Sequence, residues 1–252
     1  VDVEIAEKIQ GARHYEERML FMLMLLRQPR TRIVYVTSQA IDPAIVDYYL
    51  HLLPGVPSGH ARQRLVLLNC HDGSPQPLTE KVLGRRRLLE RVRAEVHDPE
   101  ATHLICYNVT PLERTLAVRL GLPLYGCDPA LWHLGTKSGN REIFREAGVR
   151  CADGRENLKN AEEVAAALVE LKTEHPGLKH AVVKLNEGIS GGGNARFSFA
   201  GCPQGEGLAE WVRRELPQRL AYEAPGETWA GYMRLFEQQR GVVECFLEAK
   251  AV

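Results

Sequence analysis

A glycine-rich stretch in the second half of the chain restricts the fold more than any other feature of the sequence. It begins with the apolar run Val182-Val183-Lys184-Leu185, passes through a loop with four glycines, and ends in Arg196-Phe197-Ser198-Phe199. The last four residues alternate between polar and aromatic, which is the period of a half-buried strand. The stretch therefore predicts two antiparallel strands joined by a flexible glycine loop.

A lysine beside such a loop favours phosphate binding, because glycines let backbone N–H groups approach an anion and lysine adds a positive charge. Two common phosphate loops are excluded: no lysine follows the glycines, and no GxGxxG motif leads into a helix. A protein kinase is excluded as well, since its lysine lies on a later strand and no HRD or DFG signature occurs. A surface hairpin that only needs a flexible tip remains the alternative interpretation.

The first half of the chain shows a different pattern, in which strands alternate with helices. After an N-terminal helix over residues 4–27, a further long helix is predicted over 79–96, with its arginines on a solvated face. Buried strands are predicted at four apolar runs: 32–37, 65–69, 103–107 and 122–126. Alternation of this kind is typical of a doubly wound parallel sheet.

The second half reads as an α+β unit rather than a continuation of that sheet. Besides the hairpin, it contains four predicted helices and a last strand: 138–147, 160–174, 208–220, 228–239 and 241–247. We therefore predict an α/β protein with two domains, 1–135 and 136–252.

Composition narrows the class of partner. The 252 residues contain 32 basic and 32 acidic side chains, and this balance gives no overall field for nucleic acid or an anionic membrane. The apolar run 19–26 is too short to span a bilayer, which takes about 20 residues, and predicts a buried helix. Six scattered cysteines without a CxxC pair indicate reduced thiols and a cytoplasmic protein. The oligomeric state is open, with a homo-oligomer among the alternatives.

Polar residues that follow the predicted parallel strands are candidates for substrate binding, because ligands bind at the carboxyl ends of such strands. They are His71, Asp72 and Asn108. The sequence also reads Cys70-His71-Asp72, but no second group of histidines has metal-ligand spacing.

Three stretches resemble the ATP-grasp ligases in order and spacing. The hairpin is similar to the nucleotide-binding hairpin of that family. Upstream, Leu131-Trp132-His133-Leu134-Gly135-Thr136-Lys137, followed by a helix and Ala147-Gly148-Val149, resembles the family's first nucleotide lysine. Downstream, Gly241-Val242-Val243-Glu244-Cys245-Phe246-Leu247-Glu248 resembles the strand that holds adenine. The sequence motif Lys-Leu-Asn-Glu-Gly-x-Ser-Gly-x-Gly-Asn is most similar to that of peptide ligases of the pheganomycin-biosynthesis type.

The resemblance implies a fold: a Rossmann-like parallel sheet of the pre-ATP-grasp kind, followed by an ATP-grasp subdomain with a glycine-rich hairpin. It also implies an ATP site. Lys137 and Lys184 would contact the phosphates, and Val183 with Phe246 would form part of an apolar slot for adenine. The resemblance also implies that residues of the glycine loop fold over the phosphates and that residues of the last strand contact adenine. They are Ser190, Gly191, Gly192 and Gly193 in the loop, and Glu244, Phe246 and Leu247 in the strand.

The implied activity is an ATP-dependent carboxylate–amine ligase of the peptide type. ATP converts a carboxylate into an acyl phosphate, and an amine displaces phosphate; such phosphoryl transfer needs positioning and charge neutralisation. The partners would be a small-molecule or peptide carboxylate and an amine.

The sequence departs from the family in one respect. In the family, a second ATP-grasp subdomain holds magnesium, and we find no such subdomain in the sequence up to Val252. Any Mg²⁺ ligands are thus expected beyond Val252, and none is assigned in this chain. Two alternatives remain open: an ATP-grasp kinase that phosphorylates a small molecule, and a catalytically incomplete nucleotide-binding module.

Overall fold

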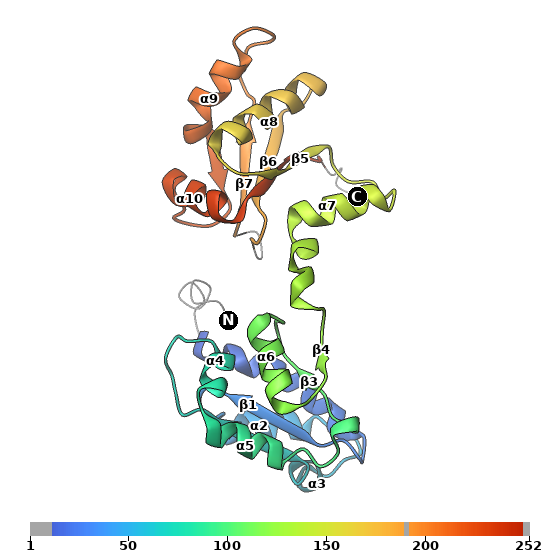
Figure 1. Cartoon of the computed structure of the whole chain (residues 1–252). Helices are drawn as coiled ribbons and strands as arrows, with labels where there is room; N and C mark the ends of the chain where they lie inside the picture. The colour runs from blue at the N-terminus through green and yellow to red at the C-terminus, as the bar shows by residue number, and fades with distance from the viewer. Residues whose placement is uncertain (1–11, 189–191, 249–252) are drawn as a thin grey trace. The chain divides into compact units, whose positions relative to one another are not determined.

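The computed structural model describes residues 12–188 and 192–248, which form two compact units (Figure 1). The first unit is Val1–Ala130 and the second is Leu131–Val252. Each unit has hydrophobic clusters of its own, so each is described by itself.

The first unit consists of short parallel strands with helices between them. In chain order its elements are η1 (Ala12–Arg27), β1 (Ile33–Thr37), α2 (Pro43–His51), α3 (Ser58–Arg62), β2 (Leu65–Asn69), α4 (Leu78–Leu83), α5 (Arg86–Ala94), η2 (Pro99–Ala101), β3 (Leu104–Ile105), α6 (Pro111–Leu120), β4 (Leu124–Tyr125) and the start of η3 (Pro129–Gly135).

All the strand pairs of the first unit are parallel, β1 with β2 and β3 with β4. Helices cover both faces of the β1–β2 pair. Ile33 and Tyr35 pack into a cluster built by η1 and α2, while Val34 and Val36 pack into one built by α4, α5 and α6. The predicted α/β class with parallel strands is thereby confirmed; the structure resolves the strands as two separate pairs.

The first helix buries three leucines that are spaced three residues apart. Leu20, Leu23 and Leu26 are each fully buried, and a 3₁₀ helix such as η1, with three residues per turn, places them in one row. The predicted helix is confirmed from Ala12 onward, and residues 4–11 lie outside the described residues. Its predicted burial is confirmed in part, because Phe21, Met24 and Leu25 in the apolar run are exposed. Within residues 12–188 and 192–248, no helix has the length and apolar character needed to cross a membrane.

The prediction of one continuous helix over 79–96 is wrong, because the structure divides this segment into α4 and α5. Gly84 ends α4, and Arg85 leaves the helical region with φ −115° and ψ 85°. The Arg85 side chain turns back to the Lys81 carbonyl at 2.9 Å and to the Asp72 carboxylate at 2.7 Å. Periodicity could not reveal this break, since tertiary contacts of Arg85 stabilise it.

The second unit is an antiparallel sheet with helices. Its elements are the rest of η3, α7 (Lys137–Glu146), β5 (Gly154–Leu158), α8 (Ala161–Glu174), β6 (His180–Leu185), β7 (Asn194–Ser198), α9 (Leu208–Arg219), β8 (Leu220–Tyr222), α10 (Trp229–Gln239) and β9 (Gly241–Cys245).

The five strands of this sheet lie in the order β5-β9-β6-β7-β8, and every neighbouring pair is antiparallel. Helices α8, α9 and α10 bury one face of the sheet (Figure 1), with Phe197, Trp211 and Phe236 in the shared core. The opposite face is called the open face below. The predicted hairpin is confirmed as β6 and β7.

Two strands of this sheet, β5 and β8, were not predicted. The sequence Gly-Arg-Glu-Asn-Leu of β5 lacks the alternation of a half-buried strand, and the register shifts between Arg155 and Leu158. Asn157 within that shift has a φ of +60°. Both strands lie at the edges of the sheet, where fewer partners constrain the sequence.

Candidate functional site

The open face presents the polar side chains of the glycine hairpin and of the adjacent strand β9. Successive side chains of a strand point to opposite faces. Ala181, Val183 and Leu185 therefore enter the core, each at most 4% exposed, whereas Val182 and Lys184 lie on the open face. Glu244 pairs across the sheet with Val182, so it lies on the same face, one row from Lys184.

Glu244 lies between two cations. One of its carboxylate oxygens accepts a hydrogen bond from the Lys184 ammonium, and the other lies 2.8 Å from the Arg141 guanidinium. Arg141 also donates to Glu156 at 3.2 Å and to the Ala152 carbonyl at 2.8 Å. The Glu244 side chain is 14% exposed and that of Lys184 is 29% exposed. Lys184 is thus the more accessible partner of this pair.

Lys137 is the second lysine of the site and begins helix α7. A cation at the amino end of a helix opposes the helix dipole, so its position there is not explained by helix stability. Its ammonium donates to the Gly188 carbonyl at 2.9 Å. Burial lowers the pKa of Lys137, and the nearby Lys184 ammonium lowers it further, while Glu244 acts in the opposite direction. Lys137 and Lys184 therefore form a cation pair that an anion would stabilise.

The two ends of the glycine loop meet in a narrow neck. A Cβ atom on Gly188 would lie 2.7 Å from the Gly193 Cα, and one on Gly193 would lie 2.7 Å from the Gly188 Cα. The Gly193 carbonyl accepts from Leu185 N at 2.8 Å and lies 3.0 Å from the Tyr232 hydroxyl. Glycine is thus required at both positions for close packing. Of the predicted loop contacts, Gly192 is exposed and Gly193 is buried, and Ser190 and Gly191 lie outside the described residues.

The residues predicted to hold adenine follow β9. Phe246 is 37% exposed and Leu247 is 72% exposed. The Phe246 N–H already donates to the His180 carbonyl at 3.2 Å, whereas the Leu247 N–H has no hydrogen bond to another described residue. The prediction that Val183 contributes to the apolar slot is wrong, because Val183 is fully buried in the helix-covered core; the neighbouring Val182 lies on the open face.

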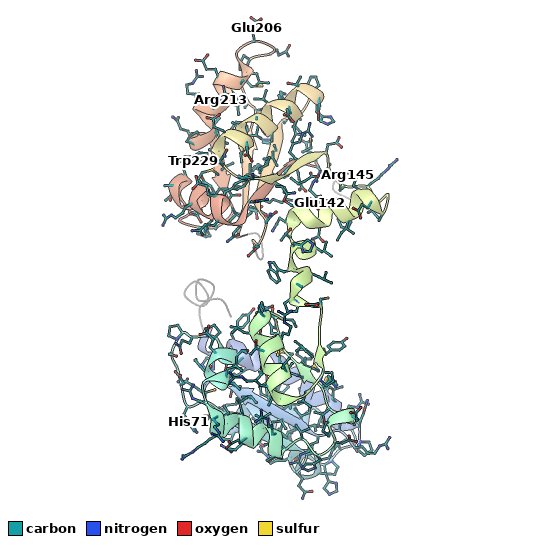
Figure 2. All side chains as sticks on the ribbon, viewed as in Figure 1. His71, Glu142, Arg145, Glu206, Arg213 and Trp229 are labelled. Atoms are coloured by element: carbon teal, nitrogen blue, oxygen red, sulfur yellow. The ribbon has the colours of Figure 1, made fainter. Side chains whose placement is uncertain are left out.

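In the first unit, the structure gives Asp72 a structural role. Asp72 accepts from Ser74 N at 2.9 Å and from Arg85 at 2.7 Å. Hydrogen bonds from Ser74 hold the pKa of Asp72 well below its ordinary value, and Arg85 adds to the effect. His71 has a φ of +52°, and Figure 2 shows it at the surface of this unit. Asn108 is exposed. That these three residues bind substrate stays a prediction.

Lys81 lies beside Asp72 and is buried at 3% exposure. Its ammonium donates to Ser38 Oγ at 2.9 Å and to the carbonyls of Asp72 at 3.0 Å and Ser74 at 2.7 Å. Ser38 Oγ in turn donates to Glu16 at 2.6 Å. All three N–H bonds of Lys81 are therefore used to hold together the segments that follow β1 and β2.

Sequence reasoning missed Arg141 and Asn186 in the second unit. Arg141 passes close over β5 because Gly154 has no side chain: a Cβ atom there would lie 3.0 Å from the guanidinium. No local sequence pattern marks this contact, because the register that places Gly154 opposite Glu244 is known only from the structure. Asn186 is buried at 7% exposure, and it follows Lys184 in the hairpin motif itself.

A hollow of about 850 Å³ lies apart from the lysine pair, between α7, β5 and α8. Arg141 and Glu156 line its inner part, and Arg145 extends from α7 at its rim (Figure 2). Its charged walls are paired with one another, Arg145 with Glu156 and Arg155 with Glu170 and Glu174. Within residues 12–188 and 192–248 there is no cluster of three or more His, Cys, Asp or Glu side chains that could hold a metal ion.

The open face thus combines a lysine pair, a glycine neck and a half-buried carboxylate, as expected for a nucleotide site of the ATP-grasp class. Residues 129–218 match the family model described as "IQCH-like, ATP-grasp". This part of the chain therefore belongs to the ATP-grasp superfamily, and the family predicted from the three motifs is confirmed.

Individual proteins similar to this chain are longer than it is. L-propargylglycine–L-glutamate ligase of Streptantibioticus cattleyicolor is 33% identical over 187 residues, which are 71% of this chain and 38% of the ligase. IQ motif-containing protein H of Danio rerio is 23% identical over 264 residues, covering 88% of this chain and 25% of that protein. The ADP complex of purK, N5-carboxyaminoimidazole ribonucleotide synthetase, superimposes with a TM-score of 0.43 at 13% identity, covering 91% of this chain and 44% of that one.

Proposed function

We propose that this chain is the nucleotide-binding part of an ATP-dependent carboxylate–amine ligase that acts through an acyl phosphate. The observation that supports it best is the convergence of Lys137, Lys184 and Glu244 on the open face beside the glycine neck. The ligase that is 33% identical joins two amino acids, as its name states, and this likeness favours amino acid or peptide substrates. The residues thus fit a nucleoside triphosphate, whose phosphates would meet Lys137 and Lys184.

In this proposal, the two ends of the open face bind different parts of the nucleotide: one end binds the phosphates and the other binds adenine. Lys137 and Lys184 neutralise phosphate charge, which lowers the cost of phosphoryl transfer. The edge of adenine meets Glu244, the backbone of Leu247 and the side chain of Phe246. Phe246 lies four residues beyond Val242, the register partner of Lys184, which is about 13 Å along a strand. An extended nucleotide would occupy this length.

Residues of the protein position the site before phosphoryl transfer takes place. Glu244 keeps Lys184 on the open face, and Arg141 keeps Glu244 from turning away. A bound nucleotide would exclude water from the Lys137 side, where burial already strengthens electrostatic interactions. Mg²⁺ would balance additional phosphate charge, and no ligand for it is assigned among residues 12–188 and 192–248.

Product analysis tests the ligase activity. The full-length natural protein is incubated with ATP, Mg²⁺, an acyl donor such as a peptide, and candidate amino acids as amines. We expect ADP and phosphate to be released only when acyl donor and amine are both present. A stable phosphate ester on a hydroxyl group of the substrate, formed without any amine, would contradict the ligase proposal and favour a kinase; an acyl phosphate would not.

A nucleotide-binding module without ligase activity is the second candidate. The matching family model is named after IQ motif-containing protein H, and that relative aligns with 88% of this chain. Binding of ATP without turnover, for every donor and amine pair tested, would favour this candidate.

A further inference from the structure

The turn that follows β6 connects the two lysines of the proposed nucleotide site. Lys137 and Lys184 belong to segments far apart in the sequence. Lys184 lies near the end of β6, and the next residues, Asn186, Glu187 and Gly188, all contact the segment that bears Lys137. Glu187 accepts from Trp132 Nε1 at 3.3 Å, and Gly188 accepts from the Lys137 ammonium at 2.9 Å.

Asn186 makes the central contacts of this turn. Its side-chain oxygen accepts from Ser138 N at 3.1 Å and from Ser138 Oγ at 2.7 Å. Its side-chain nitrogen donates to the Gln239 carbonyl at 3.1 Å. The backbone adds two bonds, because Asn186 N donates to Arg240 O at 3.1 Å and Asn186 O accepts from Lys137 N at 3.3 Å. A single buried residue thereby joins the start of α7, the end of β6 and the connection from α10 to β9.

The same contacts use the donors at the amino end of α7. Lys137 N and Ser138 N donate to Asn186, and Gly139 N donates to Thr136 Oγ at 3.0 Å. These N–H groups are therefore not available to bind phosphate, as they are in many helix-based anion sites. Positive charge on this side of the site comes from the Lys137 side chain, whose direction depends on how α7 is held.

We propose that Asn186 is a positioning residue that sets the Lys137 ammonium beside Lys184 on the open face. An aspartate or leucine of the same size could not replace it, since the site needs an acceptor toward Ser138 and a donor toward Gln239 on one planar group. The role in ATP binding rests on the proposed function. The placement of Lys137 does not.

The test compares three single variants of the 252-residue chain. Asn186→Ala removes the connection completely, and Ser138→Ala removes one of its hydrogen bonds and disturbs the fold less. The control is Asn160→Ala, which removes the side-chain bond to Glu163 N at the start of α8 and leaves the turn after β6 intact.

The first readout is the pKa of Lys137 by NMR titration of its side chain, with Lys137→Arg to assign the signal. We expect this pKa to rise toward that of an exposed lysine in Asn186→Ala, to rise less in Ser138→Ala and to stay unchanged in Asn160→Ala. Asn160→Ala also destabilises the fold through the loss of a helix cap, so a general loss of stability would raise the pKa in this control as well. An unchanged pKa in folded Asn186→Ala and Ser138→Ala would overturn the proposal.

The second readout is the affinity for ATP compared with adenosine. We expect Asn186→Ala to weaken ATP binding about tenfold and to leave adenosine binding unchanged, because adenosine has no phosphate for Lys137 to contact. Equal ATP affinity in Asn186→Ala and the parent chain would overturn the role of Asn186. Failure of the parent chain to bind ATP would instead contradict the proposed function, and the Lys137 titration would still decide the placement.

Discussion

Lysines in the two units differ in how fully their hydrogen bonds are used. Lys81 of the first unit is 3% exposed and donates to three acceptors. Lys184 of the second unit is 29% exposed and has Glu244 as its partner, and Lys137 donates to one carbonyl. An ammonium group has three donors. Lys81 therefore has no capacity left for a ligand, whereas Lys137 and Lys184 do.

The number of hydrogen bonds that a lysine ammonium already donates distinguishes a lysine with a structural role from one that could bind a ligand. This criterion does not require the ligand to be known. Both types lie near loops that follow strands, where a substrate could bind. Counting the satisfied donors distinguishes them, because a buried charge is tolerated only when its hydrogen bonds are made. The three lysines give predictions that differ in kind and size.

Lys81→Met has the largest expected effect, and it is on stability. The substitution leaves Ser38 Oγ and the carbonyls of Asp72 and Ser74 without their donor, which we expect to cost about 3 kcal/mol of unfolding free energy. Denaturant unfolding followed by circular dichroism measures it. A loss below about 1 kcal/mol would show that Lys81 does not hold these segments together.

The matched control for that experiment is Lys159→Met, at an exposed position of the second unit. We expect Lys159→Met to leave the unfolding free energy unchanged. ATP affinity should also be unchanged in Lys81→Met under conditions where the protein stays folded.

Lys184→Ala has the next largest effect, and we expect it on binding rather than on stability. Loss of a hydrogen bond to a charged phosphate costs on the order of 1.5–3 kcal/mol, or roughly ten- to a hundredfold in affinity. Calorimetry with ATP measures it, with Lys159→Ala as the control. Unchanged affinity would remove Lys184 from the proposed site.

The smallest effect concerns the charge of Lys137. Burial and the neighbouring Lys184 lower its pKa, so this ammonium begins to lose its proton at a lower pH than an ordinary lysine. Anionic phosphates favour the charged form, and ATP binding should therefore take up a fraction of a proton at a pH below the pKa of an ordinary lysine. Affinity should fall as the pH rises through the pKa of free Lys137.

Calorimetry in buffers of different ionisation enthalpy measures this proton uptake. Lys137→Arg is the control, because arginine stays charged throughout this range, and it should abolish the uptake. Equal uptake in the variant would assign the proton to another group. The lowered pKa also affects folding: charged Lys137 opposes folding below its folded-state pKa, and this penalty disappears as the pH rises through that pKa toward the unfolded value.

Local signals in the sequence predicted many elements. The predicted helix 160–174 is an example, since α8 begins where Asn160 caps it. The strands β1, β2, β6 and β9 follow from apolar runs because each has at least one face in a core. In contrast, β5 was missed, since an edge strand with a register shift has no regular alternation to detect.

For the candidate site, the sequence by itself determined which residue types were present and in what order: a lysine before a helix, a lysine before a glycine loop, and a glutamate on a last strand. These depend on local chemistry, which a motif preserves. Only the tertiary structure decided that Val182 rather than Val183 lies on the open face, and that Arg141 holds Glu244. It also decided that Asn186 joins α7 to β6. The reason is physical: strand register and the burial of polar groups are set by partners distant in the chain, and no local pattern encodes them.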